Sequence, residues 1–211
     1  MLNPEGFRQH IRRAGERVRW FKAYPHTCYD PATNYDHQRG CEDCEFGMYY
    51  QEHALRSAVR VLLTELKERF LHPEFGVVKM GDLVCQTMPD ELRLGLLDKL
   101  VLQERSLLKR ERLTKGVDTF SEPYPAELVS VTAGATVYRV GTDCRLGPTA
   151  VTWMAGGNAP ATNALYAVEF LYHPVFWCIL GDEKPPRPLP LCTGGLTPQR
   201  VYLVRKHPGE A

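Results

Sequence analysis

The strongest indication of the fold lies in residues 128–140, which have the sequence Leu-Val-Ser-Val-Thr-Ala-Gly-Ala-Thr-Val-Tyr-Arg-Val. Short runs rich in β-branched and apolar residues lie on both sides of Ala133-Gly134. Such runs predict strands, and a glycine between them predicts a turn. The stretch therefore predicts two short strands joined by a turn.

The same pattern continues to the C-terminus, with turn residues such as Gly141, Gly147 and Gly156 between short apolar runs and a proline-rich loop at 185–190. Strands at this spacing are typical of small barrels and sandwiches. The expected strands are residues 128–132, 136–140, 150–154, 166–172, 175–179 and 200–205. We expect residues 128–211 to form a β-meander that packs on a small β-barrel or completes it.

Residues 51–127 are expected to form a first β-barrel-like region. Residues 75–85 have a strand pattern interrupted by a Gly-Asp turn, and residues 97–102 form another apolar run. Residues 52–70 fit both a helical and a strand period, so periodicity leaves the choice open. The charged stretch 104–115 predicts either a long hairpin or a helical excursion.

Residues 1–50 are expected to form a basic helix followed by a zinc knuckle. Asn3 is a good N-cap, Pro4 suits the first helical position, and Glu5 suits the positive first turn. An apolar face at helical spacing predicts a helix that ends at Pro25; its residues are Phe7, Ile11, Ala14, Val18 and Phe21. The arginines Arg8, Arg12, Arg13, Arg17 and Arg19 indicate a solvated face or a contact with an acidic partner or with DNA.

The composition sets limits on the function. The chain has 211 residues and a net charge of +1, which does not favour a general binder of nucleic acids. No apolar run approaches the roughly 20 residues that span a bilayer, and the first 22 residues lack a signal peptide. We therefore expect a protein made and kept in a cytosol, whose seven cysteines do not form disulfides.

One cluster of residues has metal-binding chemistry. His26 and Cys28 are followed by Cys41 and Cys44, with glycines at positions 40 and 47 that let the backbone curl around an ion. Zn²⁺ takes four such ligands in a tetrahedron, and four protein ligands leave no open position for a substrate. The predicted site is therefore structural, with His37 as a rival fourth ligand. The other interpretations are a redox pair of Cys41 and Cys44 and cysteines that bind no ligand.

Catalytic motifs are not found elsewhere in the sequence, and we expect a protein that is not an enzyme. It has no Gly-x-Ser-x-Gly elbow and no phosphate-binding glycine loop, and 156–158 predict a turn. Asp82, Asp98 and Asp118 are expected to cap backbone amides beside turns or strand ends. The scattered cysteines are expected to be small apolar residues; these are Cys85, Cys144, Cys178 and Cys192.

The order of these motifs resembles the neck proteins of tailed bacteriophages, in which an N-terminal helix precedes a zinc knuckle. The resemblance is carried by 24–28 (Tyr-Pro-His-Thr-Cys) and 41–50 (Cys-Glu-Asp-Cys-Glu-Phe-Gly-Met-Tyr-Tyr), and more loosely by 73–82, 138–143 and 151–160. It spans most of the chain, but only the knuckle is a specific motif. The family more often has cysteine at the position of His26; its pattern favours His26 over His37 by register alone.

The resemblance implies a head-to-tail connector or head-closure (stopper) protein of the virion, made in the cytoplasm of the host bacterium. It implies a ring of 6 or 12 copies between the portal or adaptor and the tail or terminator proteins, with no membrane. DNA would pass through the lumen, where helix arginines or residues 109–112 could face it. It also implies a strand at 52–70 and a structural Zn²⁺ on His26, Cys28, Cys41 and Cys44.

Three alternatives stay open. A tail or baseplate structural protein fits the same features. A zinc-knuckle module for nucleic acids is disfavoured by the acidic residues Glu42, Asp43 and Glu45, since such knuckles are basic and aromatic. A thiol oxidoreductase would need a βαβ context that the flanking polar loop does not supply.

Overall fold

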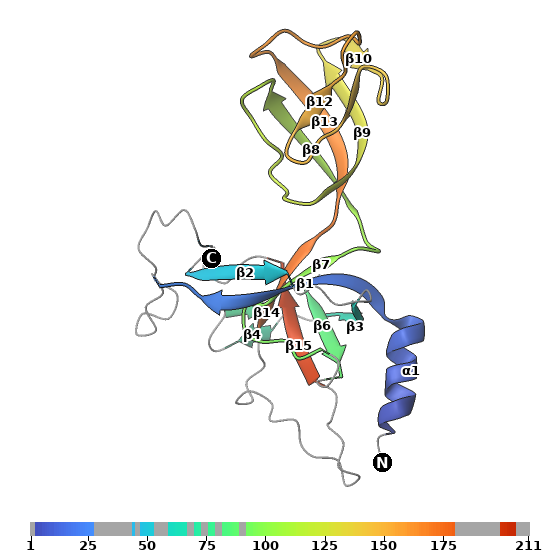
Figure 1. Ribbon diagram of the computed structural model, residues 1–211, viewed down its shortest axis with the longest axis vertical. Coiled ribbons are helices and arrows are strands. Elements are labelled where there is room, and N and C mark those ends of the chain that lie inside the picture. Colours follow the sequence, from blue (N-terminus) through green and yellow to red (C-terminus); the bar gives the residue numbers. More distant parts are fainter. Residues whose placement is uncertain are drawn as a thin grey trace. The chain divides into compact units, whose positions relative to one another are not determined.

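The computed structural model has a mainly β fold with one N-terminal helix, and its elements are labelled in Figure 1. It describes residues 3–27, 44, 47–52, 59–66, 70–72, 76–78, 82–88, 92–179 and 199–205. Within these residues, no helix is long and apolar enough to cross a membrane. The predicted fold class, mainly β with an N-terminal helix and a small barrel, is confirmed.

The helix α1 spans Pro4–Ala14 and begins as the sequence predicts. The Asn3 side chain accepts hydrogen bonds from the amides of Glu5 and Gly6, which have no partner inside the helix. Ile11 is the buried residue of its inner face.

The predicted continuation of this helix to Pro25 is wrong. The helix ends at Ala14, Gly15 is extended (φ −75°, ψ 148°), and the strand β1 spans Glu16–Pro25. Val18 and Trp20 are both buried, which is the period of two of a strand. Val18 also fits the helical period, whereas Trp20 does not, so the helical pattern beyond Gly15 was coincidental.

Six strands form a closed barrel. β1 pairs with β3 (Val59–Glu65), and pairing continues through β6 (Leu83–Thr87), β15 (Gln199–Val204), β14 (Val175–Ile179) and β7 (Lys99–Leu102) back to β1. All these pairings are antiparallel. Residues 59–65 are therefore a strand, as the resemblance implied. Closure removes the exposed sheet edges that an open sheet would have.

Two further pairs of strands accompany the barrel. β2 (Met48–Glu52) pairs with the C-terminal half of β1, next to the part that pairs with β3. β4 (Phe70–His72) pairs with β5 (Gly76–Val78) in a separate ladder.

Residues Arg105–Pro174 form a second compact unit, a β structure with its own sheet. Its sheet has the strand order β10-β9-β13-β8, and β11 pairs with β12. The strands are β8 (Leu107–Thr114), β9 (Pro125–Ala133), β10 (Thr136–Tyr138), β11 (Cys144–Leu146), β12 (Val151–Trp153) and β13 (Leu165–Tyr172). Gly134, at φ 58°, lies in the predicted turn between β9 and β10.

The stretch 104–115 contains one long strand, β8, and is neither a hairpin nor a helix. Its partner is β13, more than 50 residues later in the chain, so no local pattern could indicate the pairing. Within the predicted segment 128–211, β14 and β15 join the barrel beside β7 and β6 and complete it, which is one of the two expected arrangements, whereas β9 to β13 belong to separate sheets.

The chain divides into two compact units, Met1–Glu104 with Val175–Ala211, and Arg105–Pro174. These boundaries differ from those of the three predicted segments, 1–50, 51–127 and 128–211. Each unit has a separate buried core. The barrel core includes Val61, Leu100 and Leu203, and the core of the second unit includes Val131 and Phe170.

Candidate functional site

The predicted metal site belongs to the loop that joins β1 to β2. These strands pair from Phe21 opposite Glu52 to Pro25 opposite Met48. The pairing extends by one more position, where the His26 amide donates a hydrogen bond of 2.8 Å to the Gly47 carbonyl. Residues 26 and 47 are therefore the two ends of one closed hairpin loop, in which all four predicted ligands lie.

Two of the predicted ligands are described. His26 lies on the first leg of the loop, and Cys44 lies three residues before Gly47 on the second leg, with its side chain half-buried. Cys28, Cys41 and the rival ligand His37 lie outside the described residues. Within the described part of the chain, no three His, Cys, Asp or Glu side chains gather closely enough to hold a metal ion.

The donor set suits zinc, since three thiolates and one imidazole are ligands that Zn²⁺ takes in closed structural sites. A Cys-x-x-Cys half-site and a His-x-Cys half-site must approach each other to share an ion. The hydrogen bond between His26 and Gly47 brings together the chain ends that carry these half-sites. The donor set of this loop thus fits Zn²⁺, and of its four members His26 and Cys44 lie within the described residues.

Side chains on both faces of the hairpin stabilise it. Tyr24 and Tyr49 stack across the two strands with ring centroids 5.2 Å apart. On the other side Arg19 makes two hydrogen bonds of 2.7 Å to the Glu52 carboxylate, and its guanidinium lies 5.0 Å from the Phe21 ring centre. The Arg19 hydrogen bonds lower the pKa of Glu52, so the pair is charged at neutral pH.

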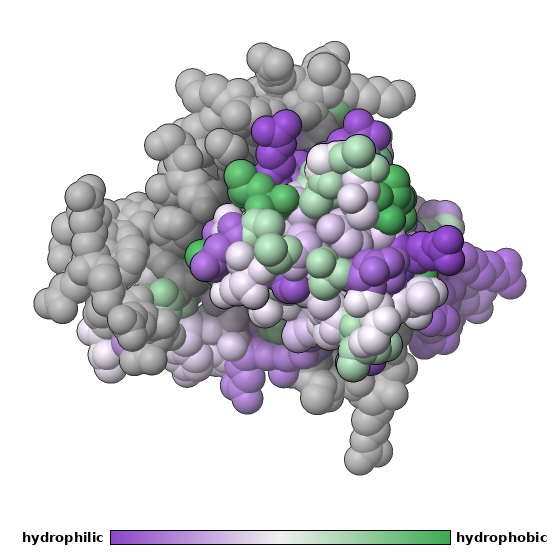
Figure 2. Space-filling model, turned by 90° about the horizontal axis from the view of Figure 1, so that it is seen from above, coloured by the Kyte–Doolittle hydropathy of each residue, from purple (hydrophilic) through white to green (hydrophobic). Residues whose placement is uncertain are grey.

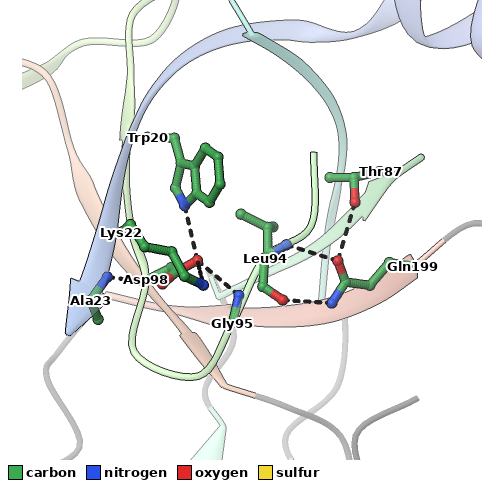
Figure 3. Close-up of polar contacts among 8 residues, drawn as sticks. All are labelled: Trp20, Lys22, Ala23, Thr87, Leu94, Gly95, Asp98 and Gln199. Carbon is green, nitrogen blue, oxygen red and sulfur yellow. Dashed lines mark hydrogen bonds and ion pairs between the residues drawn. The ribbon is translucent and has the colours of Figure 1, made fainter. Parts of the chain in front are cut away.

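A second polar cluster lies inside the barrel (Figure 3). The Asp98 carboxylate is fully buried and accepts four hydrogen bonds, from Trp20 Nε1 at 2.9 Å, Lys22 Nζ at 3.0 Å, the Ala23 amide at 3.0 Å and the Gly95 amide at 2.8 Å. A carboxylate has about four acceptor sites, so these donors satisfy it. The cluster fastens the segment before β7 to β1.

The same segment is fastened a second time by Gln199 on β15. The Gln199 side chain accepts from the Leu94 amide at 2.9 Å and donates to the Leu94 carbonyl at 2.7 Å (Figure 3). Leu92 and Leu94 are buried in the barrel core, and Leu97 is fully buried at φ 61°. The segment 92–98 therefore places apolar side chains in the barrel core, and its polar groups bond to β1 through Asp98 and to β15 through Leu94.

The predicted roles of the aspartates are confirmed. Asp98 accepts from two backbone amides, the Asp118 carboxylate accepts from the Thr114 amide at 2.6 Å, and Asp82 accepts from the Arg205 amide at 3.2 Å. The sequence did not reveal the bonds of Asp98 to Trp20 and Lys22, or those of Gln199 to Leu94. The position of Asp98 between the apolar residues 96–97 and 100–102 indicated that its carboxylate would be buried and would need hydrogen-bond partners.

The cysteines of the two cores are buried thiols. Cys85, Cys144 and Cys178 are fully buried, as predicted, and Cys192 lies outside the described residues. Burial raises the pKa of all three buried thiols, and for Cys144 the nearby Asp143 carboxylate adds to the effect. A thiol with a raised pKa stays protonated and is a poor nucleophile or metal ligand.

Several of the basic residues for which a solvated face and a contact with an acidic partner or DNA were the two interpretations have intramolecular partners. Arg8 pairs with Glu5, Arg17 with Glu104, and Arg19 with Glu52; on β8, Lys109 pairs with Glu122 and Arg110 with Glu169. The carboxylates of these pairs offset the positive charge of their basic partners. Less positive charge is therefore available to attract a polyanion than the sequence pattern suggested.

No known protein family and no curated protein matches this chain. The residues of the chain and the contacts they make are therefore the basis on which a function can be proposed.

Proposed function

We propose that this chain is a non-enzymatic structural protein of the neck of a tailed bacteriophage. In this proposal it forms a ring that connects the portal or adaptor to the tail, as a head-to-tail connector or head-closure protein. One Zn²⁺ ion, held by His26, Cys28, Cys41 and Cys44, stabilises the loop between β1 and β2.

The observation that carries the proposal is the hydrogen bond of 2.8 Å between His26 and Gly47 at the base of the hairpin. It supports the proposed zinc knuckle because the segments that carry the two half-sites both begin at the same end of the paired strands β1 and β2. The knuckle is in turn the specific motif on which the resemblance to neck proteins depends.

Two further features support a structural role. The barrel core is apolar, and the hydrogen bonds of the Asp98 and Gln199 side chains fasten the segment 92–98 to the barrel strands. A metal ion in place of disulfides suits a loop too polar to build a core of its own.

The first test is metal analysis of the purified full-length chain. We expect about one zinc per chain, because the four ligands form one closed site. Replacing Cys41 and Cys44 together by serine is expected to abolish binding. Cys85→Ala, which removes a thiol from the barrel core, is the matched control and should keep the metal. Comparing His26→Ala with His37→Ala identifies the fourth ligand.

The second test is electron microscopy of the same samples, alone and mixed with portal particles. Rings of uniform size are expected for the wild-type chain, and fewer rings for the variant without metal. A chain that binds no zinc and forms no ring, even on portal particles, contradicts the proposal. Zinc binding without rings would favour a tail or baseplate position.

A further inference from the structure

The first leg of the hairpin, the end of β1, is anchored to the barrel close to the predicted metal ligands. The buried Asp98 carboxylate accepts hydrogen bonds of 3.0 Å from Lys22 Nζ and from the Ala23 amide (Figure 3). Ala23 lies three residues before His26, and the preceding residues Val18–Phe21 pair with β7. The barrel therefore fixes the chain that leads into the first half-site, through groups that are not metal ligands.

The second leg, β2, is anchored by its own side chains. Arg19 donates two hydrogen bonds of 2.7 Å to the Glu52 carboxylate. Lys99 Nζ lies 3.7 Å from the centroid of the Tyr50 ring, which is within the range of a cation–π interaction. Tyr50 follows Gly47 by three residues, so the chain that leads away from the second half-site is fixed as well.

Between these anchors and the loop lies the stacked pair of Tyr24 and Tyr49. The two residues are opposite each other in the register, and their ring planes are 19° apart at a centroid distance of 5.2 Å. Each lies two residues from the hydrogen bond between His26 and Gly47 that closes the base of the loop. The stack is thus the side-chain contact that joins the two legs beside the half-sites.

The exposure of the two tyrosines indicates that the stack does not serve the barrel core. Tyr24 is 37% exposed and Tyr49 43%. Exposed hydrophobic residues that are scattered singly are normal, and on the face drawn in Figure 2 hydrophobic residues lie among hydrophilic ones. Tyr24 and Tyr49 differ from such residues because they are paired across two strands at the base of the predicted metal loop.

We propose that Tyr24 and Tyr49 are positioning residues of the zinc site, whose stack holds the two ends of the loop together before the metal binds. The inference rests on the zinc site of the proposed function. In many small metal-binding domains the metal has to fold the chain as it binds, which reduces the apparent affinity. A base that is already paired leaves only the loop to be ordered, so zinc affinity depends on the stack.

Hydrogen exchange of the metal-free chain tests whether the base is formed in advance. The full-length chain is stripped of metal with a chelator, and the exchange of the His26 amide, which donates to Gly47, is followed by NMR. This amide is expected to stay protected in the metal-free wild type and to exchange faster in Tyr49→Ala, while the barrel strands keep their rates.

Competition for Zn²⁺ with a chromophoric chelator measures the affinity. Tyr49→Ala is expected to bind Zn²⁺ about fivefold more weakly, which corresponds to the loss of one aromatic pair. Tyr49→Phe keeps the ring and should bind like the wild type. Gln51→Ala is the matched control, because Gln51 is exposed on the same face of β2 two positions further from the loop, and it should leave the affinity unchanged.

Three results would overturn the inference: wild-type affinity in Tyr49→Ala, equally weak binding in Tyr49→Phe and Tyr49→Ala, or loss of His26 protection when the metal is removed from the wild type. Urea denaturation of each metal-free variant establishes that its barrel is intact. A wild-type chain that takes up no Zn²⁺ contradicts the zinc site of the proposed function, and the inference fails with it. Zinc uptake that does not respond to the stack overturns the inference alone.

Discussion

Among single residues, Asp98 connects segments that are far apart in the sequence. Its carboxylate bonds to Trp20, Lys22 and Ala23, which precede it by 75 to 78 residues, and to the nearby Gly95. The sequence indicated that Asp98 caps backbone amides, since aspartate beside a turn commonly does so. It could not indicate the distant donors, because only closure of the barrel brings β1 to this segment.

Asp98→Ala is expected to destabilise the barrel by about 3–5 kcal/mol. The substitution leaves a buried indole N–H and two amides without an acceptor and Lys22 without its counter-ion. Urea denaturation of the full-length chain measures the loss. Asp118→Ala removes a single capping bond at an exposed turn and should cost only about 1 kcal/mol. Equal effects of the two substitutions would refute the central role of Asp98.

Asp143 gives the second unit an acid-sensitive contact. Hydrogen bonds from the amides of Arg139 and Asn158, both 2.8 Å long, lower its pKa from the ordinary value of 3.8. A lowered pKa in the folded state contributes stability that is present above the ordinary value and is lost as the pH falls through the folded value. Asp143→Asn is therefore expected to destabilise the chain at neutral pH, with a difference from the wild type that shrinks in acid. Thermal unfolding from pH 7 to pH 2 measures it; a difference independent of pH would contradict the expectation.

At the scale of elements, the start of α1 could be predicted from local chemistry, but its end could not. Asn3 and Pro4 marked the start of α1 through local chemistry, and the structure confirms it. The end was mispredicted because Val18 fits both periods, whereas the extended Gly15 and the buried Trp20 decide for a strand. The strand at 59–65 was ambiguous for the same reason: its apolar residues satisfy two periods, and pairing with β1 and β6 decides between them.

The N-cap of α1 provides a test at this scale. Asn3→Ala removes the acceptor of the Glu5 and Gly6 amides and is expected to cost about 1 kcal/mol of helix stability. Amide hydrogens of α1 should then exchange roughly fivefold faster, while those of the barrel strands keep their rates. Asn3→Ser retains a capping oxygen and serves as the control. Unchanged exchange in Asn3→Ala would show that packing, rather than the cap, holds the helix start.

At the scale of the whole molecule, the sequence predicted strands but not which strands belong together. The second unit is inserted between β7 and β14, two strands that pair with each other in the barrel. An insertion of this kind interrupts the barrel in sequence without interrupting it in space, so residues 128–211 resembled one continuous meander. The same holds for the predicted metal site. The residue types in the loop identified His26 and Cys44 as candidate ligands. The pairing of β1 with β2, which brings the two ends of that loop together, could not be predicted from the sequence.

Separate cores predict separate unfolding. Leu100 is fully buried in the barrel core and Phe170 is fully buried in the core of the second unit. Leu100→Ala is expected to cost about 2–5 kcal/mol and Phe170→Ala about 3–5 kcal/mol, each within its own unit. Because the two clusters share no residue, each substitution should accelerate hydrogen exchange in the strands of its own unit and leave the other unit protected. Acceleration in both units by either substitution would mean that the barrel and the inserted unit unfold as one cooperative structure.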